Sequence, residues 1–175
     1  MVRPDYLTLL TGAWQWLNGT SFYPNGTKYE GHPDFAMGLD ATGILHYTKG
    51  LPDDALWVST ILHPLNNLTS LRPPNIIYDA EDSGSLAEWA LIGQHNLAYG
   101  APFNMEVFQK GDPSVTTGDQ GRLVHGPIKF SNVPSFAGVS LERNFTFLDD
   151  DNLLRLRTWD AKNGVIGYLN WRRMT

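Results

Sequence analysis

The sequence contains no cysteine among its 175 residues, which excludes disulfide bonds, thiolate metal ligands and a cysteine nucleophile. Basic residues are also few, since 13 Lys and Arg stand against 18 Asp and Glu and the formal net charge is -5. A nucleic-acid-binding surface needs clustered positive charge, and the only such cluster is Arg172-Arg173. We therefore expect no nucleic-acid partner. The lack of cysteine fits a reducing, cytoplasmic location.

Long hydrophobic runs are missing as well. No stretch of about 18 consecutive apolar residues occurs, so the sequence offers no candidate membrane-spanning helix. Residues 1–25 contain no continuous apolar segment of the kind found in a secretory signal peptide. We therefore expect neither membrane insertion nor secretion.

The common cofactor and metal motifs are absent too. There is no phosphate-binding glycine loop, dinucleotide fingerprint or G-x-S-x-G motif, so we expect no nucleotide, flavin or nicotinamide cofactor. The five histidines, at positions 32, 46, 63, 95 and 125, form neither H-x-H nor H-E-x-x-H, and no metal site is predicted. Any chemistry should then be cofactor-free, such as proton transfer, isomerisation or ring closure of a bound molecule.

Apolar and aromatic residues are what the sequence does contain. Hydrophobic residues make up 42% of the chain and aromatic residues 12%, whereas only 18% of residues are charged. This composition excludes a disordered chain, and the length fits one domain over residues 1–175 with a full core.

Short β-branched, aromatic or alternating segments, separated by turn residues, predict eight or nine strands. They cover residues 10–16, 35–39, 44–48, 56–62, 98–108, 122–130, 138–148, 153–159 and 165–173. The expected turns and loops between them cover 18–27, 40–43, 63–74, 110–120, 132–138, 149–152 and 162–164. Residues 1–9 are expected to form a leader with about one helical turn. The capping box at 85–88 and the apolar spacing after it predict a short helix over 86–96.

The two ends of the chain resemble those of the lipocalins and, more closely, of the lipocalin-like domain family. The matching residues are Gly12-x-Trp14 in the first predicted strand and Trp171-Arg172-Arg173 in the last. The order of predicted elements also matches. The resemblance implies an all-β fold, an eight- to nine-stranded antiparallel calycin-type barrel with one short helix, closed at one end by an arginine lying on an indole face.

The same resemblance implies a function. Lipocalin-like proteins encoded beside fungal natural-product pathways are often cyclases or isomerases that fold a hydrophobic intermediate inside the barrel. We therefore expect a cofactor-independent isomerase or cyclase acting on a polyketide-, terpenoid- or alkaloid-like molecule, as a monomer or homodimer. The alternatives are a non-catalytic carrier of a small apolar ligand and a filled barrel that acts as an interaction module.

Alternation on the predicted strand 138–148 puts Leu141, Arg143, Phe145 and Phe147 on one face. If that face lines the barrel, Arg143 directs a positive charge into the pocket, where the resemblance suggests that it polarises a carbonyl or stabilises an oxyanion. The equally weighted alternative is a buried Arg143 paired with an Asp or Glu.

The other candidate catalytic residues depend on which strand face points inward, and alternation alone does not decide that. His46 and His125 lie within predicted strands and are candidates for proton transfer, and Tyr99 is a candidate hydrogen-bonding group. Glu106 is an acid or base candidate only if it points inward, and its parity favours water. The candidate substrate-binding walls are Trp57, Trp89, Phe103 and Trp159, although core packing is the commoner role of any single aromatic residue.

Overall fold

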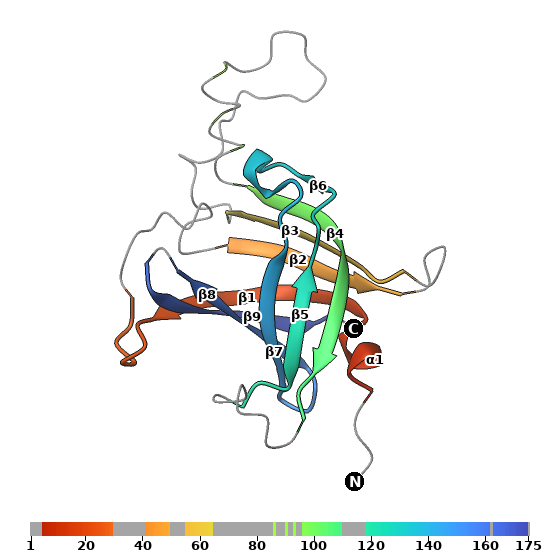
Figure 1. Cartoon of the computed structure of the whole chain (residues 1–175), viewed down its shortest axis with the longest axis vertical. Coiled ribbons are helices and arrows are strands. Elements are labelled where there is room, and N and C mark those ends of the chain that lie inside the picture. Colours follow the sequence, from red (N-terminus) through yellow and green to blue (C-terminus); the bar gives the residue numbers. More distant parts are fainter. Residues whose placement is uncertain are drawn as a thin grey trace.

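The computed structural model describes residues 5–29, 41–49, 55–64, 96–109, 118–161 and 163–174, together with Leu86, Ala90 and Gly93. Within these residues strands are the main secondary structure (Figure 1). The elements are α1 (Tyr6–Leu10), β1 (Gly12–Phe22), β2 (Ala41–Thr48), β3 (Trp57–Pro64), β4 (Leu97–Val107), β5 (Gly121–His125), β6 (Phe130–Ser131), the 3-10 helix η3 (Pro134–Phe136), β7 (Leu141–Leu148), β8 (Leu153–Asp160) and β9 (Val165–Arg173).

Eight of the strands form a closed antiparallel barrel. Their order is β3-β2-β1-β9-β8-β7-β5-β4, and pairing between β4 and β3 closes the circle. The short strand β6 pairs with β4 as an addition to the barrel. The predicted all-β barrel of eight to nine strands with a short helix is thus confirmed. No helix within the described ranges is long and apolar enough to cross a membrane.

Alternation along the strands separates an apolar interior from a mixed outer surface, because successive side chains of a strand point to opposite faces. On β2, for example, Leu45 and Tyr47 are buried, whereas Ile44 and His46, which alternate with them, are exposed. All eight barrel strands contribute buried residues to one hydrophobic cluster in the interior. Knowing which parity points inward therefore decides which side chains can reach a bound molecule.

Helix α1 covers one end of the barrel. Its Tyr6 ring lies 5.6 Å from that of Phe145. Beside it, the guanidinium of Arg173 lies 4.2 Å from the ring centre of Trp14 and donates a hydrogen bond to the Leu9 carbonyl. The predicted contact between an arginine of the last strand and the Trp14 indole is confirmed. Side chains of α1 and β9 thus meet at this end of the barrel, and Figure 1 shows α1 beside the C-terminal end of β9.

Two glycines have a different role from the one that the sequence suggested. The pair Asn18-Gly19 was expected to begin a turn, but β1 continues to Phe22 because β9 pairs with it as far as Ile166, after a register shift between Trp16 and Asn18. Gly19 leaves room for the Trp16 ring, whose nearest atom would lie 3.0 Å from an added Cβ. The turn is confined to the residues that follow Phe22.

Gly43 was likewise expected in a hairpin turn but lies within β2. A Cβ at this position would lie 2.2 Å from the Ile61 carbonyl oxygen, so glycine allows β2 and β3 to approach each other closely.

The predicted strand 122–130 is shorter than expected. It ends at His125, since Gly126 has a φ of 152° that a strand residue with a side chain rarely adopts. The predicted strand at 35–39, most of the predicted helix at 86–96 and most of the loops at 63–74 and 110–120 lie outside the described residues.

Candidate functional site

Three polar side chains from three strands meet inside the barrel. His125 is the last residue of β5, Tyr47 lies on β2 and Tyr99 lies on β4. Each shares the inward face of its strand with apolar or glycine residues two positions away. The exposed fractions are 1% for His125, 0% for Tyr47 and 6% for Tyr99. Because polar groups buried this deeply need hydrogen-bond partners, the three side chains must satisfy one another or a bound molecule.

The three side chains form one hydrogen-bonded chain. The Tyr47 hydroxyl lies 2.9 Å from His125 Nε2, and the Tyr99 hydroxyl lies 2.8 Å from His125 Nδ1. A neutral imidazole carries one N–H donor and one acceptor nitrogen. One tyrosine therefore donates its O–H to His125, and the other accepts the His125 N–H. The accepting tyrosine keeps its own hydroxyl proton, for which no protein acceptor lies within the described residues.

All three groups are held neutral by their surroundings. Burial lowers the pKa of His125 from 6.5 to about 3, and the positive charge of Arg143 contributes to this shift. Burial raises the pKa of Tyr99 to about 12 and that of Tyr47 well above its ordinary value, with Arg143 opposing both shifts. Near neutral pH the cluster therefore contains two phenols and one uncharged imidazole.

Arg143 is a charged residue that acts on this cluster. It lies on β7 and shares the inward face with Phe145 and Phe147, as the alternation predicted. Its charge lowers the pKa of both tyrosines and of His125, so it lies within electrostatic reach of all three.

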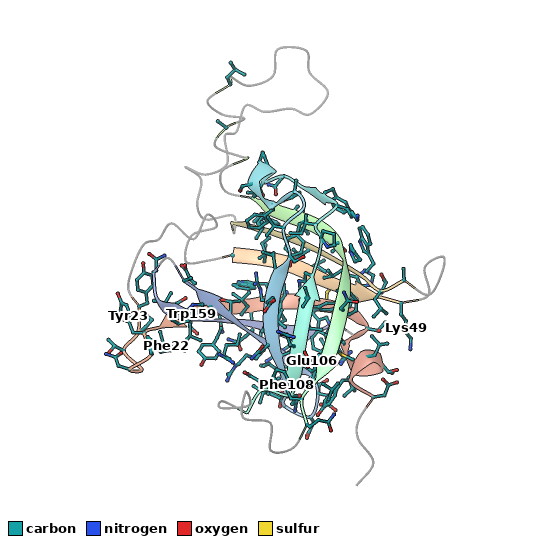
Figure 2. The ribbon with its side chains drawn as sticks, in the orientation of Figure 1. Phe22, Tyr23, Lys49, Glu106, Phe108 and Trp159 are labelled. Carbon is teal, nitrogen blue, oxygen red and sulfur yellow. The ribbon has the colours of Figure 1, made fainter. Side chains whose placement is uncertain are left out.

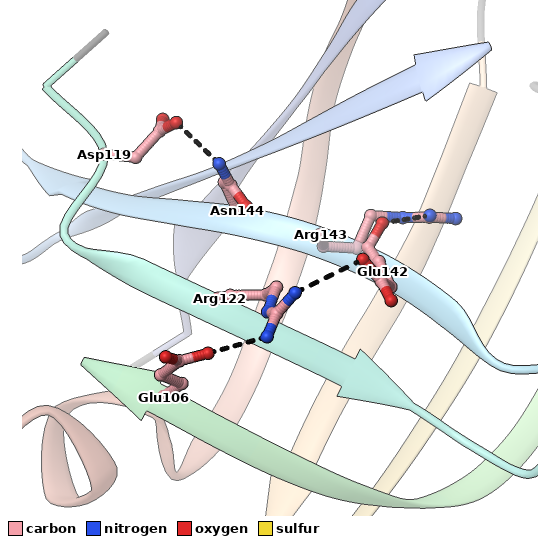
Figure 3. A network of polar contacts seen from close by, with 6 residues as sticks. All are labelled: Glu106, Asp119, Arg122, Glu142, Arg143 and Asn144. Carbon is pink, nitrogen blue, oxygen red and sulfur yellow. Dashed lines mark hydrogen bonds and ion pairs between the residues drawn. The ribbon is translucent and has the colours of Figure 1, made fainter. Parts of the chain in front are cut away.

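The partner of Arg143 is a backbone carbonyl and not an acid. Its Nη1 donates a hydrogen bond of 2.7 Å to the Glu142 carbonyl oxygen, and no carboxylate pairs with it in the described part of the chain. Figure 3 shows its guanidinium directed away from the ion pairs that link Glu106, Arg122 and Glu142. Burial lowers the pKa of the guanidinium and the two tyrosines oppose that shift. Arg143 thus provides a cationic donor for an electron-rich atom of a ligand.

Aromatic rings enclose the interior around the polar cluster. Phe103 is buried and packs edge-on against Tyr47, with 5.1 Å between ring centres. On the wall formed by β1 and β9, Trp16 and Trp171 pack edge to face at 4.9 Å. Such walls favour a flat or polycyclic apolar ligand.

His46 does not belong to this site. It was a candidate for proton transfer, but β2 turns Leu45 and Tyr47 inward, so His46 between them points outward. It lines an open depression of about 500 Å³ on the outer surface, together with residues of β1 to β4, Tyr99 among them, and Phe130 of β6. Strand parity separates His46 from the interior cluster.

Glu106 also lies on the outer surface, with 58% of its side chain exposed. Its carboxylate accepts a hydrogen bond of 2.8 Å from Arg122, whose other nitrogen lies 3.7 Å from Glu142 (Figure 3). The parity of β4 had favoured this outward orientation. Glu106 is therefore not placed where it could act on a molecule inside the barrel.

Two of the four predicted wall residues point away from the interior. Trp57 shares the outer face of β3 with Ser59 and Ile61, and its ring lies 6.0 Å from that of Phe130. Trp159 is 57% exposed and lies near Phe22 at the outer tip of the sheet formed by β1, β9 and β8 (Figure 2). Phe103 does line the interior, and Trp89 lies outside the described residues.

Three interior residues were missed by the sequence analysis: Tyr47, Trp16 and Trp171. The sequence could have indicated Tyr47, because it lies two residues after Leu45 and therefore on the same face of the strand. His46 lies on the opposite face. Trp16 and Trp171 lie in the predicted first and last strands. Their contact depends on the register between β1 and β9, which the sequence around each residue does not determine.

The described residues contain no group of three or more His, Asp or Glu side chains that could hold a metal ion. No protein-family model matches the chain, and no curated protein matches it in sequence. The closed eight-stranded antiparallel barrel is consistent with a calycin- or lipocalin-like fold.

Proposed function

We propose that this protein is a cofactor-independent isomerase or cyclase that acts on a small, largely apolar molecule inside the barrel. The observation that carries the proposal is the Tyr47–His125–Tyr99 chain, in which hydrogen bonds of 2.9 and 2.8 Å join three proton-carrying groups. The positive charge of Arg143 lies beside this chain. Together these groups suit a reaction that moves a proton and develops negative charge on an oxygen.

The chain can relay a proton without creating a buried ion. One tyrosine accepts a proton from the bound molecule while passing its own hydroxyl proton to the facing nitrogen of His125. The other nitrogen of His125 releases its proton to the second tyrosine, which donates its hydroxyl proton to another atom of the molecule. The molecule becomes its tautomer, and exchange with water between turnovers restores the original imidazole tautomer. A His125 pKa of about 3 does not prevent this relay, because imidazolium never accumulates.

Arg143 has a separate role in the proposed reaction. A guanidinium without a carboxylate partner can bind a carbonyl oxygen and stabilise the negative charge that develops on it during enolisation or ring closure. In a water-poor interior, such a preorganised charge has a larger effect than it would have in solvent. Arg143 and the hydroxyl of the accepting tyrosine would then hold the same end of the substrate.

The proposed substrate is a hydrophobic natural-product intermediate of the polyketide, terpenoid or alkaloid type. The aromatic walls around Phe103, Trp16 and Trp171 support an aromatic or polycyclic molecule. The setting in secondary-metabolite biosynthesis is supported by the resemblance of the chain ends to lipocalin-like proteins of fungal pathways. Holding a flexible intermediate in one reactive shape is itself a catalytic contribution.

A non-catalytic carrier is the second candidate, and one observation favours it. Burial keeps His125 and both tyrosines from ionising, and neutral donors beside one arginine are sufficient to anchor a ligand without turnover. In that case, the hydrogen-bonded chain would serve to position donors for recognition.

The test is to incubate the purified protein with a small-molecule extract of its own source, prepared from a strain lacking the gene. Products are separated by chromatography and identified by mass. We expect one compound to disappear while an isomer of the same mass accumulates in proportion to the amount of protein. In D₂O, an isomerisation that forms a new bond between carbon and hydrogen should leave one carbon-bound deuterium in the isomer, because that proton comes from an exchangeable tyrosine hydroxyl. Retention of a compound that is later released unchanged supports the carrier and rejects catalysis.

The matched variants are Tyr99→Phe and His46→Ala. Tyr99→Phe keeps the buried ring but removes the hydroxyl, so isomer formation should fall by roughly 10²-fold or more. His46→Ala changes the outer face only and should retain activity. Equal activity of both variants and the unmodified protein would exclude the proposed relay.

A further inference from the structure

Among the described residues, one buried polar side-chain atom has no hydrogen-bond partner. The indole Nε1 of Trp171 is buried and forms no hydrogen bond within the described residues, while the whole residue is only 2% exposed. A buried N–H group without an acceptor destabilises the folded chain, so its persistence calls for an explanation. The indole of Trp14, by contrast, donates a hydrogen bond of 2.9 Å to the Leu10 carbonyl.

Trp171 lies on the wall opposite the tyrosine of β4. Strands β8, β7 and β5 separate β9 from β4 in one direction, and β1, β2 and β3 separate them in the other. Trp171 points inward with Gly167 and Leu169 on β9. A molecule that spans the barrel can therefore touch Tyr99 at one side and Trp171 at the other.

Trp171 lies on β9 two residues before Arg173, near the end of the barrel that α1 covers. On β1, Trp14 at the end covered by α1 is 0% exposed, whereas Trp16 is 9% exposed. On β9, Leu169 is more exposed than Trp171, although both face inward. On these two strands the exposure of inward-facing residues thus increases with distance from α1, so a ligand would reach Trp171 from the opposite end of the barrel.

Packing fixes the orientation of the Trp171 ring. The Trp16 ring meets it at 77° and is itself packed on Gly19, where an added Cβ would lie 3.0 Å from the ring. The indole N–H is thus preorganised rather than free to seek another acceptor, as a recognition group should be.

We propose that Trp171 Nε1–H is a second recognition point that donates a hydrogen bond to a carbonyl oxygen of the bound molecule. This inference rests on the proposed function. The ligand class is then an aromatic ketone with two polar ends: one held by Arg143 and the Tyr47–His125–Tyr99 chain, and the other by Trp171. A molecule with only one polar end would leave the Trp171 donor unpaired.

Two probes test the inference. 4-Benzoylbenzoate has a carboxylate for Arg143 and a ketone for Trp171, and 4-benzylbenzoate replaces that ketone with a methylene group. We expect the unmodified protein to bind the ketone roughly five- to tenfold more tightly by calorimetry, as one additional hydrogen bond provides. Trp171→Phe should abolish this preference, and the control Trp159→Phe, on the outer surface, should retain it.

A second measurement uses the unmodified protein. The indole protons of its six tryptophans are observed in a ¹H–¹⁵N spectrum, with Trp171 assigned from the signal that Trp171→Phe removes. The Trp171 signal should move downfield with the ketone probe and not with the methylene probe. If the two probes bind equally, or the preference survives in Trp171→Phe, the inference is wrong.

The outcomes separate the inference from the proposed function. Arg143→Met should weaken both probes, since both carry the carboxylate. If Arg143→Met weakens both while Trp171→Phe has no effect, the Trp171 subsite is rejected and the polar cluster remains a ligand site. If Arg143→Met changes neither, or neither probe binds at millimolar concentration, the two-ended ligand class itself is rejected.

Discussion

On the two faces of the wall formed by β4, β5 and β7, charged groups have different kinds of partner. On the outer face, Glu106, Arg122 and Glu142 pair with one another in contact with solvent. On the inner face, Tyr99 and His125 are neutral, and the partner of Arg143 among the described residues is a backbone carbonyl. The charged groups of the outer network thus pair with one another. The inner network has a hydroxyl donor and a positive charge that can bind a ligand.

This difference between the two faces predicts that removing a charge has a larger effect on the inner face than on the outer face. Exposed ion pairs are weakened by water and salt, and each contributes little to stability. A charge in the barrel interior acts through a medium of lower polarisability, so its influence on neighbouring groups is larger. Arg143 illustrates this, because its charge affects the pKa of two tyrosines and one histidine at once.

The largest effect should follow from breaking the interior packing. Trp14→Ala removes a fully buried ring at the closed end and with it the surface on which Arg173 lies, and should lower the free energy of unfolding by ~3–5 kcal/mol. Trp159→Ala removes the same ring type from the outer face and should cost less than about 1 kcal/mol. Urea denaturation of both variants measures the contrast, and comparable losses would contradict the inward and outward assignment.

The second-largest effect is expected for Arg143→Met. This variant should lower turnover of the natural substrate by about 10²–10³-fold, because it removes the charge that stabilises the developing oxyanion. Arg122→Met, on the neighbouring strand but facing outward, is the matched control and should stay within about twofold of the unmodified protein. Single-turnover rates distinguish this effect from weaker binding. A similar loss in both variants would point to a general effect on the barrel instead.

Acid should destabilise the protein through His125. Its pKa is about 3 when folded, against 6.5 as its ordinary value, so between these pH values the unfolded chain binds one more proton. The contribution of His125 to stability is therefore present above pH 6.5 and is lost as the pH falls toward 3, with the unfolding constant rising about tenfold per pH unit. In His125→Gln, unfolding measured across this range should show a shallower pH dependence. An unchanged slope would mean that His125 is protonated in the folded protein.

Glu106→Gln should have the smallest effect. The side chain is mostly exposed, so loss of its ion pair with Arg122 should change the free energy of unfolding by less than about 0.5 kcal/mol. The difference should shrink further in high salt, since salt screens exposed charges. A loss above about 2 kcal/mol at any salt concentration would remove the contrast between the two faces.

The fold was predictable because its signals are local. Alternation and turn residues located β3, β4, β7, β8 and β9 to within a few residues, and the Gly12-x-Trp14 pair with the last-strand arginines indicated how the barrel closes. The errors came from glycines. Gly19 and Gly43 were interpreted as turn residues, but they permit close packing inside strands, a use that depends on neighbours from elsewhere in the chain.

The candidate site was predictable only in part. Arg143, His125, Tyr99 and Phe103 do face inward, but His46, Glu106, Trp57 and Trp159 face outward. Alternation defines two sets of residues in each strand, and the choice between the sets depends on how the sheet curls. Choosing the set with more large apolar residues on β2 would have selected Tyr47 over His46.

The position of β9 has a consequence for how the protein is made. This strand follows all others in the chain, yet it lies between β1 and β8 in the barrel and carries the arginine that reaches α1. During synthesis, β1 emerges from the ribosome first and has no partner on that side until residues 165–173 have followed. The nascent chain therefore carries an unpaired strand edge and exposed tryptophans through most of translation, a state that invites chaperone binding. The barrel therefore cannot close before residues 165–173 have been synthesised.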